Sequence, residues 1–479
     1  MLGRDPWGHM VLTTQILKTG HVPLPKDAWT YSVYARMLGF HILNAFVITG
    51  VGMEYKWASV LIGLIMLLSE ILVMYWLVKS VFRNQKLALM SAMFICISDN
   101  ALDMTGKSII PNSVGVVAVL FVFYLLIKTL LLEGYLKPKI ILLLLIFSSS
   151  LVITHSVSYG FLLIRLMIFV LLSILLRDSS RLKQMGFLFV VALVLAFFEW
   201  GLINGYYLSQ FILLMKFLFL GTGVHVYEQN VSSIPLNLVI IARIGTILYF
   251  AIAGITILWE LRSVFKDKSK AKLGMFINSA FFVGIAPVLT FFWAGIAHRF
   301  WYYGEILGSF FVSYFALKLS NWSKLAKLFS ALFVVIISFL MFVASVSNDD
   351  NPLVPQYTLR TGWYDSEITA AKFVITKSQL PIATDIDFQH FSSVRVGMLD
   401  KSFKASPICN LKTFDSIIEN NNCLVLLRVD LLKERYFVLG KGYSQRAYLP
   451  LGAKTKEVIG KILASKDIVY TTKNVIAVV

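Results

Sequence analysis

The stretch LGRDPWGHMVLT, residues 2–13, places an arginine, an acid and an imidazole close together near the start of the chain. Asp5 can act as a general base when it is held near an acceptor hydroxyl, or it can bind a cation with a second acid. His9 is a candidate substrate contact in the same stretch. Asp5 followed by Pro6 is also a good helix start, and this structural role is compatible with the chemical one.

A second group of acids lies in SDNALDMTGKSIIPNS, residues 98–113. Asp99 and Asp103 are the candidates for a second acidic site, with which Asp5 could share a cation. Carboxylate ligands suit Mg²⁺ or Mn²⁺, but the sequence leaves the presence of a metal open.

Three arginines are candidates for binding a phosphate, because the planar guanidinium can hold phosphate oxygens by a bidentate fork. Arg165 and Arg243 fall within apolar runs, where a cation is costly unless it is paired or functional. The alternative is that these two reach the interface or pair with an acid such as Glu199. Arg299 lies at the boundary of an apolar run and is the better phosphate candidate.

Further side chains near the same boundaries are candidate substrate contacts: His155, His298, Trp301 and Glu305. His155, in VITHSVSYG, is alternatively a satisfied residue of the membrane interface. Glu70 falls in the middle of an apolar run and needs a partner inside a helix bundle, which indicates a structural role.

The elements that must position these residues are mostly lipid-soluble. The chain has 479 residues, of which 58% are hydrophobic and 15% are charged, and its mean hydropathy is +0.76. Soluble domains are about half apolar and about a quarter charged. Runs such as VGVVAVLFVFYLLIKTLLL (114–132) are long enough to cross a bilayer as helices. The sequence therefore predicts an α-helical polytopic membrane protein.

We predict ten spans and one helix that lies on the membrane surface. The spans are residues 57–78, 86–100, 113–133, 139–155, 158–176, 185–206, 236–260, 274–296, 302–320 and 326–347. The stretch 37–52 is shorter and contains His41, Asn44 and Gly50, which indicates an interfacial helix.

The basic residues give the orientation. They gather in alternate connections, at 79–86, 128–139, 177–183, 262–272 and 318–327, whereas the opposite connections hold only Lys107, Lys216 and Arg299. The positive-inside rule places the basic connections in the cytoplasm. The acids, imidazoles and aromatic groups then lie outside, so we expect a site at the outer boundary of a plasma membrane. An outward start without a preceding span departs from the usual order, and we expect that a first span is missing.

Three parts follow from this topology: a first extracytoplasmic loop with the interfacial helix (1–56), a transmembrane domain (57–347) and a small extracytoplasmic α/β domain (348–479). In the last part, Asp365-Ser366 predicts a helix that runs to residue 378. We predict strands within 381–388, 392–399, 423–431 and 468–479, the last as a hairpin around Lys473-Asn474. Cys409 and Cys423 can pair outside the cell, or they remain free thiols.

The net charge of +18 does not indicate nucleic acid. Most lysines and arginines sit in the short connections, where orientation in the membrane requires them, and no basic face or known motif supports nucleic-acid binding. Membrane lipids are the expected surroundings.

The order of features resembles the GT-C glycosyltransferases, the class of protein O-mannosyltransferases and aminoarabinose transferases, and above all their prokaryotic members. The early Asp is followed by GHVPLPKDAWTYSVYARMLGFHILNA and by the basic connection VKSVFRNQKLALMSAMF, and SIIPNSVG, ITHSVS and AHRFWYYGEIL are also similar. The resemblance covers residues 1–347 and the overall plan of the tail.

The resemblance implies an enzyme that moves a sugar from a polyprenyl-phosphate carrier to a protein, glycan or lipid acceptor at the extracytoplasmic face. It implies that Asp5 is the catalytic carboxylate and that Asp99 or Asp103 is the second acid. GWYDSE (362–367) only faintly echoes the Trp-Trp-Asp-x-Gly motif of oligosaccharyltransferases, so we do not expect that activity. Relatives that transfer single sugars generally look metal-independent, which leaves a divalent cation uncertain.

Two other functions remain open from the sequence. A transporter or flippase for a lipid-linked or anionic substrate predicts paired charges near the middle of the membrane. A scaffold whose tail binds a partner predicts no consequence from Asp5→Asn.

Overall fold

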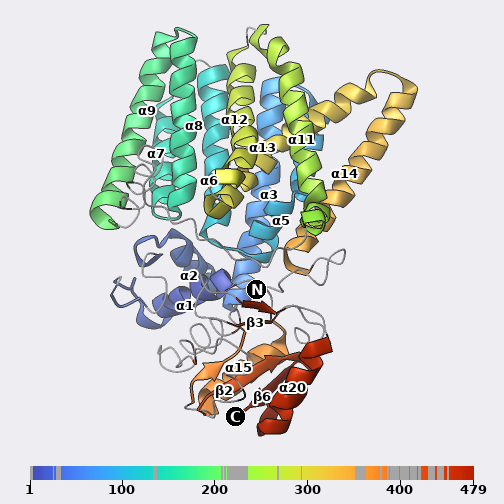
Figure 1. Ribbon diagram of the computed structural model, residues 1–479. Coiled ribbons are helices and arrows are strands. Elements are labelled where there is room, and N and C mark those ends of the chain that lie inside the picture. The colour runs from blue at the N-terminus through green and yellow to red at the C-terminus, as the bar shows by residue number, and fades with distance from the viewer. Residues whose placement is uncertain are drawn as a thin grey trace. The chain divides into compact units, whose positions relative to one another are not determined.

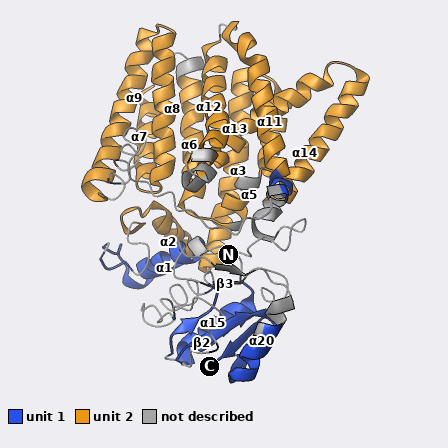
Figure 2. Ribbon diagram, viewed as in Figure 1, with its two compact units in different colours: residues 1–32, 225–243, 346–479 blue, residues 33–224, 244–345 orange. Residues whose placement is uncertain are grey.

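The computed structural model describes most of the chain. The described residues are 4–24, 26–28, 34–132, 137–205, 209, 212, 236–266, 269–292, 294–350, 363–377, 380–385, 388, 399, 409, 418, 422–429, 437–439, 447–449 and 453–479. They belong to two compact units (Figure 2). Unit 1 comprises residues 1–32, 225–243 and 346–479, and unit 2 comprises residues 33–224 and 244–345.

Unit 2 is a bundle of helices (Figure 1). Its helices are α2 (Gly39–Val51), α3 (Tyr55–Phe82), α4 (Gln85–Cys96), α5 (Asp99–Leu102), α6 (Pro111–Leu126), α7 (Pro138–Val152), α8 (Ser156–Leu175), α9 (Ser179–Phe197), α12 (Lys270–Phe292) and α13 (Ala294–Ser320), with most of α11 (Leu236–Lys266) and α14 (Lys324–Asp350). A 3-10 helix, η1 (Tyr34–Arg36), and three π-helical segments, η2 (Asp103–Lys107), η3 (Ile127–Leu132) and η4 (Phe198–Ile203), link or extend them. Helices suit such apolar sequences because a backbone in lipid must satisfy its own hydrogen bonds.

Seven helices of the described chain are long and apolar enough to cross a membrane, within 55–82, 111–129, 156–175, 179–203, 243–266, 270–290 and 324–344. All ten predicted spans fall on helices, but α4 and α7 have only 12 and 15 residues. α13 begins at Ala294, before the predicted start. α2 confirms a helix within 37–52; its 13 residues reach about 20 Å, short of the bilayer core. Its place at the membrane surface stays a prediction. The chain is a polytopic helical membrane protein.

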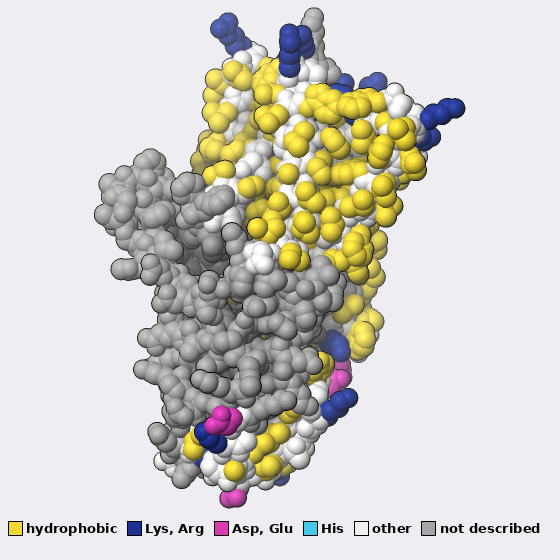
Figure 3. Space-filling model, turned by 45° about the vertical axis from the view of Figure 1, so that its right-hand side comes forward, with side chains coloured by type: hydrophobic (Ala, Val, Ile, Leu, Met, Phe, Trp, Pro, Cys, Tyr) yellow, Lys and Arg dark blue, Asp and Glu magenta, His cyan; other side chains and the backbone are white. Residues whose placement is uncertain are grey.

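The helices of unit 2 pack around one large apolar core. α12 packs along α13, α13 along α4, and α4 along α3. Figure 3 shows apolar side chains covering one side of the bundle, with Lys and Arg side chains at one end. Basic residues occupy the last turns of three helices, at Lys79, Lys266 and Lys318, where they complement the helix dipole.

Unit 1 joins the start of the chain to a small C-terminal α/β region. It contains α1 (Arg4–Thr19), α15 (Asp365–Lys377), α20 (Ala453–Ser465), and the strands β1 (Ile382–Ala383), β2 (Leu424–Arg428), β3 (Phe437–Leu439), β4 (Ala447–Leu449), β5 (Ile468–Thr471) and β6 (Val475–Val478). One sheet has the order β1-β2-β6-β5, with β1 parallel to β2 and the other pairs antiparallel, and β3 pairs with β4. The predicted helix at 365–378, three of the strand regions and the final hairpin are confirmed. The predicted strand at 392–399 lies, except for residue 399, outside the described residues.

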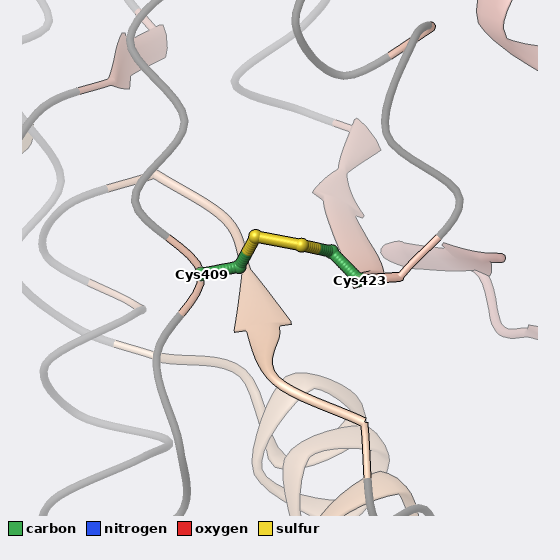
Figure 4. Close-up of a disulfide and its surroundings, with 2 residues drawn as sticks. All are labelled: Cys409 and Cys423. Atoms are coloured by element: carbon green, nitrogen blue, oxygen red, sulfur yellow. A yellow bond between two sulfur atoms is a disulfide. The ribbon is translucent and has the colours of Figure 1, made fainter.

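The apolar core of unit 1 contains a residue from the start of the chain. Trp7 of α1 is buried in one cluster with residues of α15, β1, β2 and β6, such as Val374, Leu426 and Val475. Cys409 and Cys423 form a disulfide in the same unit, with their Cα atoms 6.1 Å apart (Figure 4). Of the two alternatives that the sequence left open for these cysteines, the structure has the paired one.

Candidate functional site

Three of the short stretches that carried the resemblance meet in unit 2, although they are far apart in the sequence. The His155 side chain contacts two of them. Its Nδ1 lies 2.7 Å from Ser158 Oγ, and the Ser158 hydroxyl donates to Asn112 Oδ1 at 3.1 Å. Its Nε2 lies 3.2 Å from a terminal guanidinium nitrogen of Arg299. SIIPNSVG, ITHSVS and AHRFWYYGEIL therefore form one polar cluster.

Local structure explains how the cluster is placed. Asn112 lies in the first turn of α6, behind Pro111 at the helix start, and Arg299 lies near the start of α13. His155 is the N-cap of α8 and precedes its first residue, Ser156. The N-termini of α6 and α8 thus meet in the cluster, and the dipole of each brings partial positive charge to that end. Arg299 reaches the cluster from the second turn of α13.

Two glycines permit the close approach of these elements. A Cβ on Gly115 would lie 2.3 Å from Ser158 Oγ, so α6 and α8 can approach only because that position lacks a side chain. A Cβ on Gly39 would lie 2.2 Å from Thr154 Oγ1, and the Gly39 N–H donates to the Ile153 carbonyl at 3.1 Å. The start of α2 therefore packs against the connection between α7 and α8, which includes His155.

A second polar group contains the predicted contact Glu305. Its carboxylate is fully buried and accepts a hydrogen bond from the Ser98 hydroxyl at 2.5 Å. Ser98 directly precedes Asp99, so α13 contacts the acidic segment predicted as the second site. Asp103, in the same segment, interacts electrostatically with Tyr302. The Tyr302 phenol donates to Glu70 at 2.7 Å, which gives Glu70 the partner inside the bundle that its position required.

The predicted phosphate-binding arginines lie in three different environments. Arg299 is partly exposed and touches His155. Arg165 is fully buried: its guanidinium lies 4.5 Å from the ring centres of both Phe123 and Phe282, and it donates to Asn278 Oδ1 at 3.3 Å. Arg243 is exposed on α11. The cluster around His155 therefore includes one of the three.

The acid suggested as a partner for the intramembrane arginines is engaged elsewhere. Glu199 is buried and interacts electrostatically with Arg36. The Arg36 guanidinium also donates to the carbonyls of Ile203 and Asn204, at 2.5 and 2.6 Å. Among the described residues, no carboxylate forms an ion pair with Arg165.

For several of the remaining predicted residues, the structure describes the backbone but not the side chain. Asp5 lies in the first turn of α1 and Asp99 at the start of α5, but their side chains lie outside the described set, as does that of His298. His9 is buried in unit 1, with only 2% of its surface exposed. The Trp301 indole donates to Thr290 Oγ1 at 2.7 Å.

The described residues provide no set of ligands for a metal ion. No three His, Cys, Asp or Glu side chains gather there. We therefore name no residues for Mg²⁺ or Mn²⁺.

Sequence reasoning missed Asn112 and Ser158. Both lie in stretches that were singled out, SIIPNSVG and ITHSVS, but a single Asn or Ser carries no signal of its own. The available signal was the neighbouring Gly115 and the helix-capping position of His155.

Comparisons with known proteins address the fold. No protein-family model matches the chain, and neither does any curated protein. Among solved structures, ArnT from Cupriavidus metallidurans in the apo state matches 100% of this chain and 93% of its own, with a TM-score of 0.52 and 11% identity. The structure of ArnT from the same organism bound to undecaprenyl phosphate matches 95% of each chain, with a TM-score of 0.44 and 11% identity. ArnT is an aminoarabinose transferase of the GT-C family. The first of these likenesses shows that the chain has the fold of ArnT.

Proposed function

We propose that this chain is a membrane glycosyltransferase that moves a sugar from a polyprenyl-phosphate donor to an acceptor hydroxyl. The observation that carries the proposal is the position of Arg299. It lies next to His155, where the N-termini of α6 and α8 meet, in a bundle that exposes many large apolar side chains. Helix N-termini and a guanidinium both favour a phosphate, and the apolar helices suit a lipid tail.

The proposed reaction is a single displacement. Asp5 accepts the proton of the acceptor hydroxyl as its oxygen attacks the anomeric carbon. The bond between the anomeric carbon and the phosphate oxygen breaks, and the polyprenyl phosphate leaves with the electron pair. Arg299 stabilises the charge on the leaving phosphate, with Arg243 and Arg165 as the further candidates. One displacement inverts the anomeric centre.

The second acidic segment and the aromatic residues have supporting roles in this proposal. Asp99 and Asp103 lie beside α13, where Glu305 and Tyr302 contact their segment. We assign them, with His298 and Trp301, to sugar or acceptor contacts. His9, His155 and Glu305 are buried, so we assign them to support of these contacts.

We place the active face and the C-terminal region outside the plasma membrane. Two observations support this orientation. The basic connections lie at the other helix ends, as the positive-inside rule requires of a cytoplasmic face. The Cys409–Cys423 disulfide suits an oxidising compartment.

The test is sugar transfer in membranes that contain the chain, supplied with labelled polyprenyl-phosphate sugars. Asp5→Asn should lower transfer by about 10²-fold or more, because it removes the general base. Asp27→Asn is the matched control, since Asp27 is an exposed acid of the same N-terminal segment and should be neutral. Adding EDTA to the same assay tests whether a divalent cation takes part.

Equal transfer by wild type and Asp5→Asn would remove Asp5 from the mechanism. Movement of the labelled donor across the bilayer without transfer would replace the enzyme by a flippase. If no donor supports transfer and the labelled donor does not cross the bilayer, the scaffold function is the one that remains.

A further inference from the structure

We propose that Asn112 is a positioning residue for the donor phosphate: through Ser158 it sets the tautomer of His155, which then holds Arg299. This inference rests on the proposed function, because it gives Arg299 the phosphate as its ligand. The carrying observation is a chain of three hydrogen bonds that joins α6, α8 and α13. Asn112 and Ser158 are fully buried and His155 is 3% exposed, so water does not replace these partners.

The guanidinium of Arg299 determines where the protons lie at one end of this series of three hydrogen bonds. A guanidinium can only donate hydrogen bonds, so Nε2 of His155 must accept from it. A neutral imidazole that accepts at Nε2 carries its proton on Nδ1. The Nδ1–H then donates to Ser158 Oγ, at 2.7 Å.

Asn112 fixes the protons at the other end. Its Oδ1 accepts the Ser158 hydroxyl proton, which turns the lone pairs of Oγ toward His155. Its amide nitrogen faces the sulfur of Met104 at 3.9 Å, which agrees with Oδ1 pointing to Ser158. Both ends of this hydrogen-bond chain therefore favour a proton on Nδ1. They act against the Ser158 backbone N–H, which lies 3.2 Å from Nδ1 and favours the other tautomer.

Without the Asn112 acceptor, the other tautomer becomes accessible. The Ser158 hydroxyl can then donate to Nδ1, together with the Ser158 backbone N–H that lies 3.2 Å away in the geometry of a helix cap. The imidazole proton moves to Nε2, where it faces an N–H of Arg299. Two donors repel each other, so Arg299 loses its support.

Two residues near Ser158, Gly115 and Tyr303, allow further tests of the same series of hydrogen bonds. Gly115 allows Ser158 to approach α6, and a Cβ there would lie 2.7 Å from the Ser158 Cβ. The phenol of Tyr303 also faces Ser158 but makes no hydrogen bond of acceptable geometry among the described residues. Gly115→Ala should therefore break the chain, whereas Tyr303→Phe should leave it intact.

The first experiment reads the tautomer directly and needs no transfer activity. The protein is labelled with ¹⁵N-histidine, placed in lipid bilayers and studied by solid-state NMR, and the His155 signals are identified by their loss in His155→Gln. We expect Nδ1 to be protonated in wild type and Nε2 to be protonated in Asn112→Leu. Asn112→Asp, which restores an acceptor oxygen, should return the wild-type pattern. A protonated Nε2 in wild type, or an unchanged pattern in Asn112→Leu, would overturn the inference.

The second experiment separates donor binding from chemistry. Asn112→Leu and Ser158→Ala should raise KM for the polyprenyl-phosphate sugar about tenfold, the usual scale for one misplaced charged hydrogen bond, and change kcat little. Ser156→Ala is the matched control: Ser156 is a buried serine of the same helix and is not part of the chain. Gly160→Ala, on the same helix with open space around it, is the control for Gly115→Ala.

The outcomes distinguish the two proposals. Transfer by wild type with an unchanged KM in Asn112→Leu would reject the positioning role and leave the proposed function standing. No transfer by wild type, together with no binding of undecaprenyl phosphate, would reject the proposed function and with it the phosphate as the ligand of Arg299.

Discussion

Asp178 shows what one carboxylate does at the basic end of unit 2. It is the N-cap of α9 and accepts from the backbone N–H of Arg181 at 3.2 Å. It also accepts from Lys270 at the start of α12, at 2.6 Å, and pairs with the Arg181 guanidinium. The hydrogen bond from Lys270, with further help from Arg181, lowers the pKa of Asp178 below its ordinary value of 3.8.

The lowered pKa gives Asp178 a pH-dependent share of stability. Because the folded pKa lies below the unfolded one, this share is complete above about pH 3.8 and is lost as the pH falls through the folded value. Asp178→Asn keeps the helix cap but removes the charge, and should cost under about 1 kcal/mol because Lys270 is partly exposed.

Thermal unfolding in detergent at pH 7 and pH 3 measures this effect. The variant should unfold at a lower temperature than wild type at pH 7, and the difference should shrink at pH 3. Asp27→Asn, at an exposed acid, should show no difference at either pH. A difference that persists at pH 3 would mean that Asp178 acts through something other than its charge.

At the scale of elements, the crossing of α11 and α14 depends on one glycine. A Cβ on Gly245 would lie 2.3 Å from the Leu340 carbonyl oxygen, so the two backbones are in direct contact. Membrane helices use small residues at such crossings because close packing is what holds them together. A backbone atom cannot rotate away as a side chain can, so any larger residue must separate the helices.

Gly245→Ala should therefore destabilise the bundle by about 1–3 kcal/mol, the usual cost of overpacking. Gly254→Ala is the matched control, since Gly254 lies on the same helix with nothing within 4 Å of its added Cβ. Thermal unfolding of the two variants in the same detergent measures the difference, and Gly245→Ala should unfold at the lower temperature. Equal stability of the two variants would show that α14 can move away from α11 without cost.

Hydropathy was sufficient to predict where the helices are, but not how they end. All ten predicted spans fall on helices, because a long apolar run has one stable backbone conformation in lipid, but only seven described helices are long and apolar enough to cross. Their bounds depend on caps and contacts: α8 begins directly after its N-cap residue His155, and α6 runs on into the π-helical η3. In the tail, short apolar runs predicted β2 and the β5–β6 hairpin, whereas α20 was missed.

The candidate site was predictable as a set of residue types but not as a set of contacts. His155 and Arg299 stood out because charge and imidazole are rare in apolar sequence. Their contact joins residues 144 positions apart and depends on how α8 and α13 pack. Asn112 and Ser158 are ordinary residues until that packing buries them, so no local pattern could select them.

At the scale of the whole molecule, the two ends of the chain build one unit. The sequence divided 1–56 from 348–479, but Trp7 lies in the core formed by α15 and the sheet, with 7% of its surface exposed. α1, which begins at Arg4 and Asp5, is thereby packed on the C-terminal region. The C-terminal region thus holds the helix that carries the proposed base.

Trp7→Ala tests this role. Removing a buried Trp should cost about 3–5 kcal/mol, and the loss should fall on the C-terminal region because that is where the ring is packed. Limited proteolysis of the protein in liposomes, read by mass spectrometry, should show faster cleavage within 363–479, while fragments of unit 2 persist. Leu17→Ala, at an exposed leucine of the same helix, is the control and should change neither. If Asp5 is the base, transfer should fall in Trp7→Ala and largely return in Trp7→Phe, because a ring again fills the core. Unchanged cleavage in Trp7→Ala would mean that the tail folds without α1, and the base would then need another support.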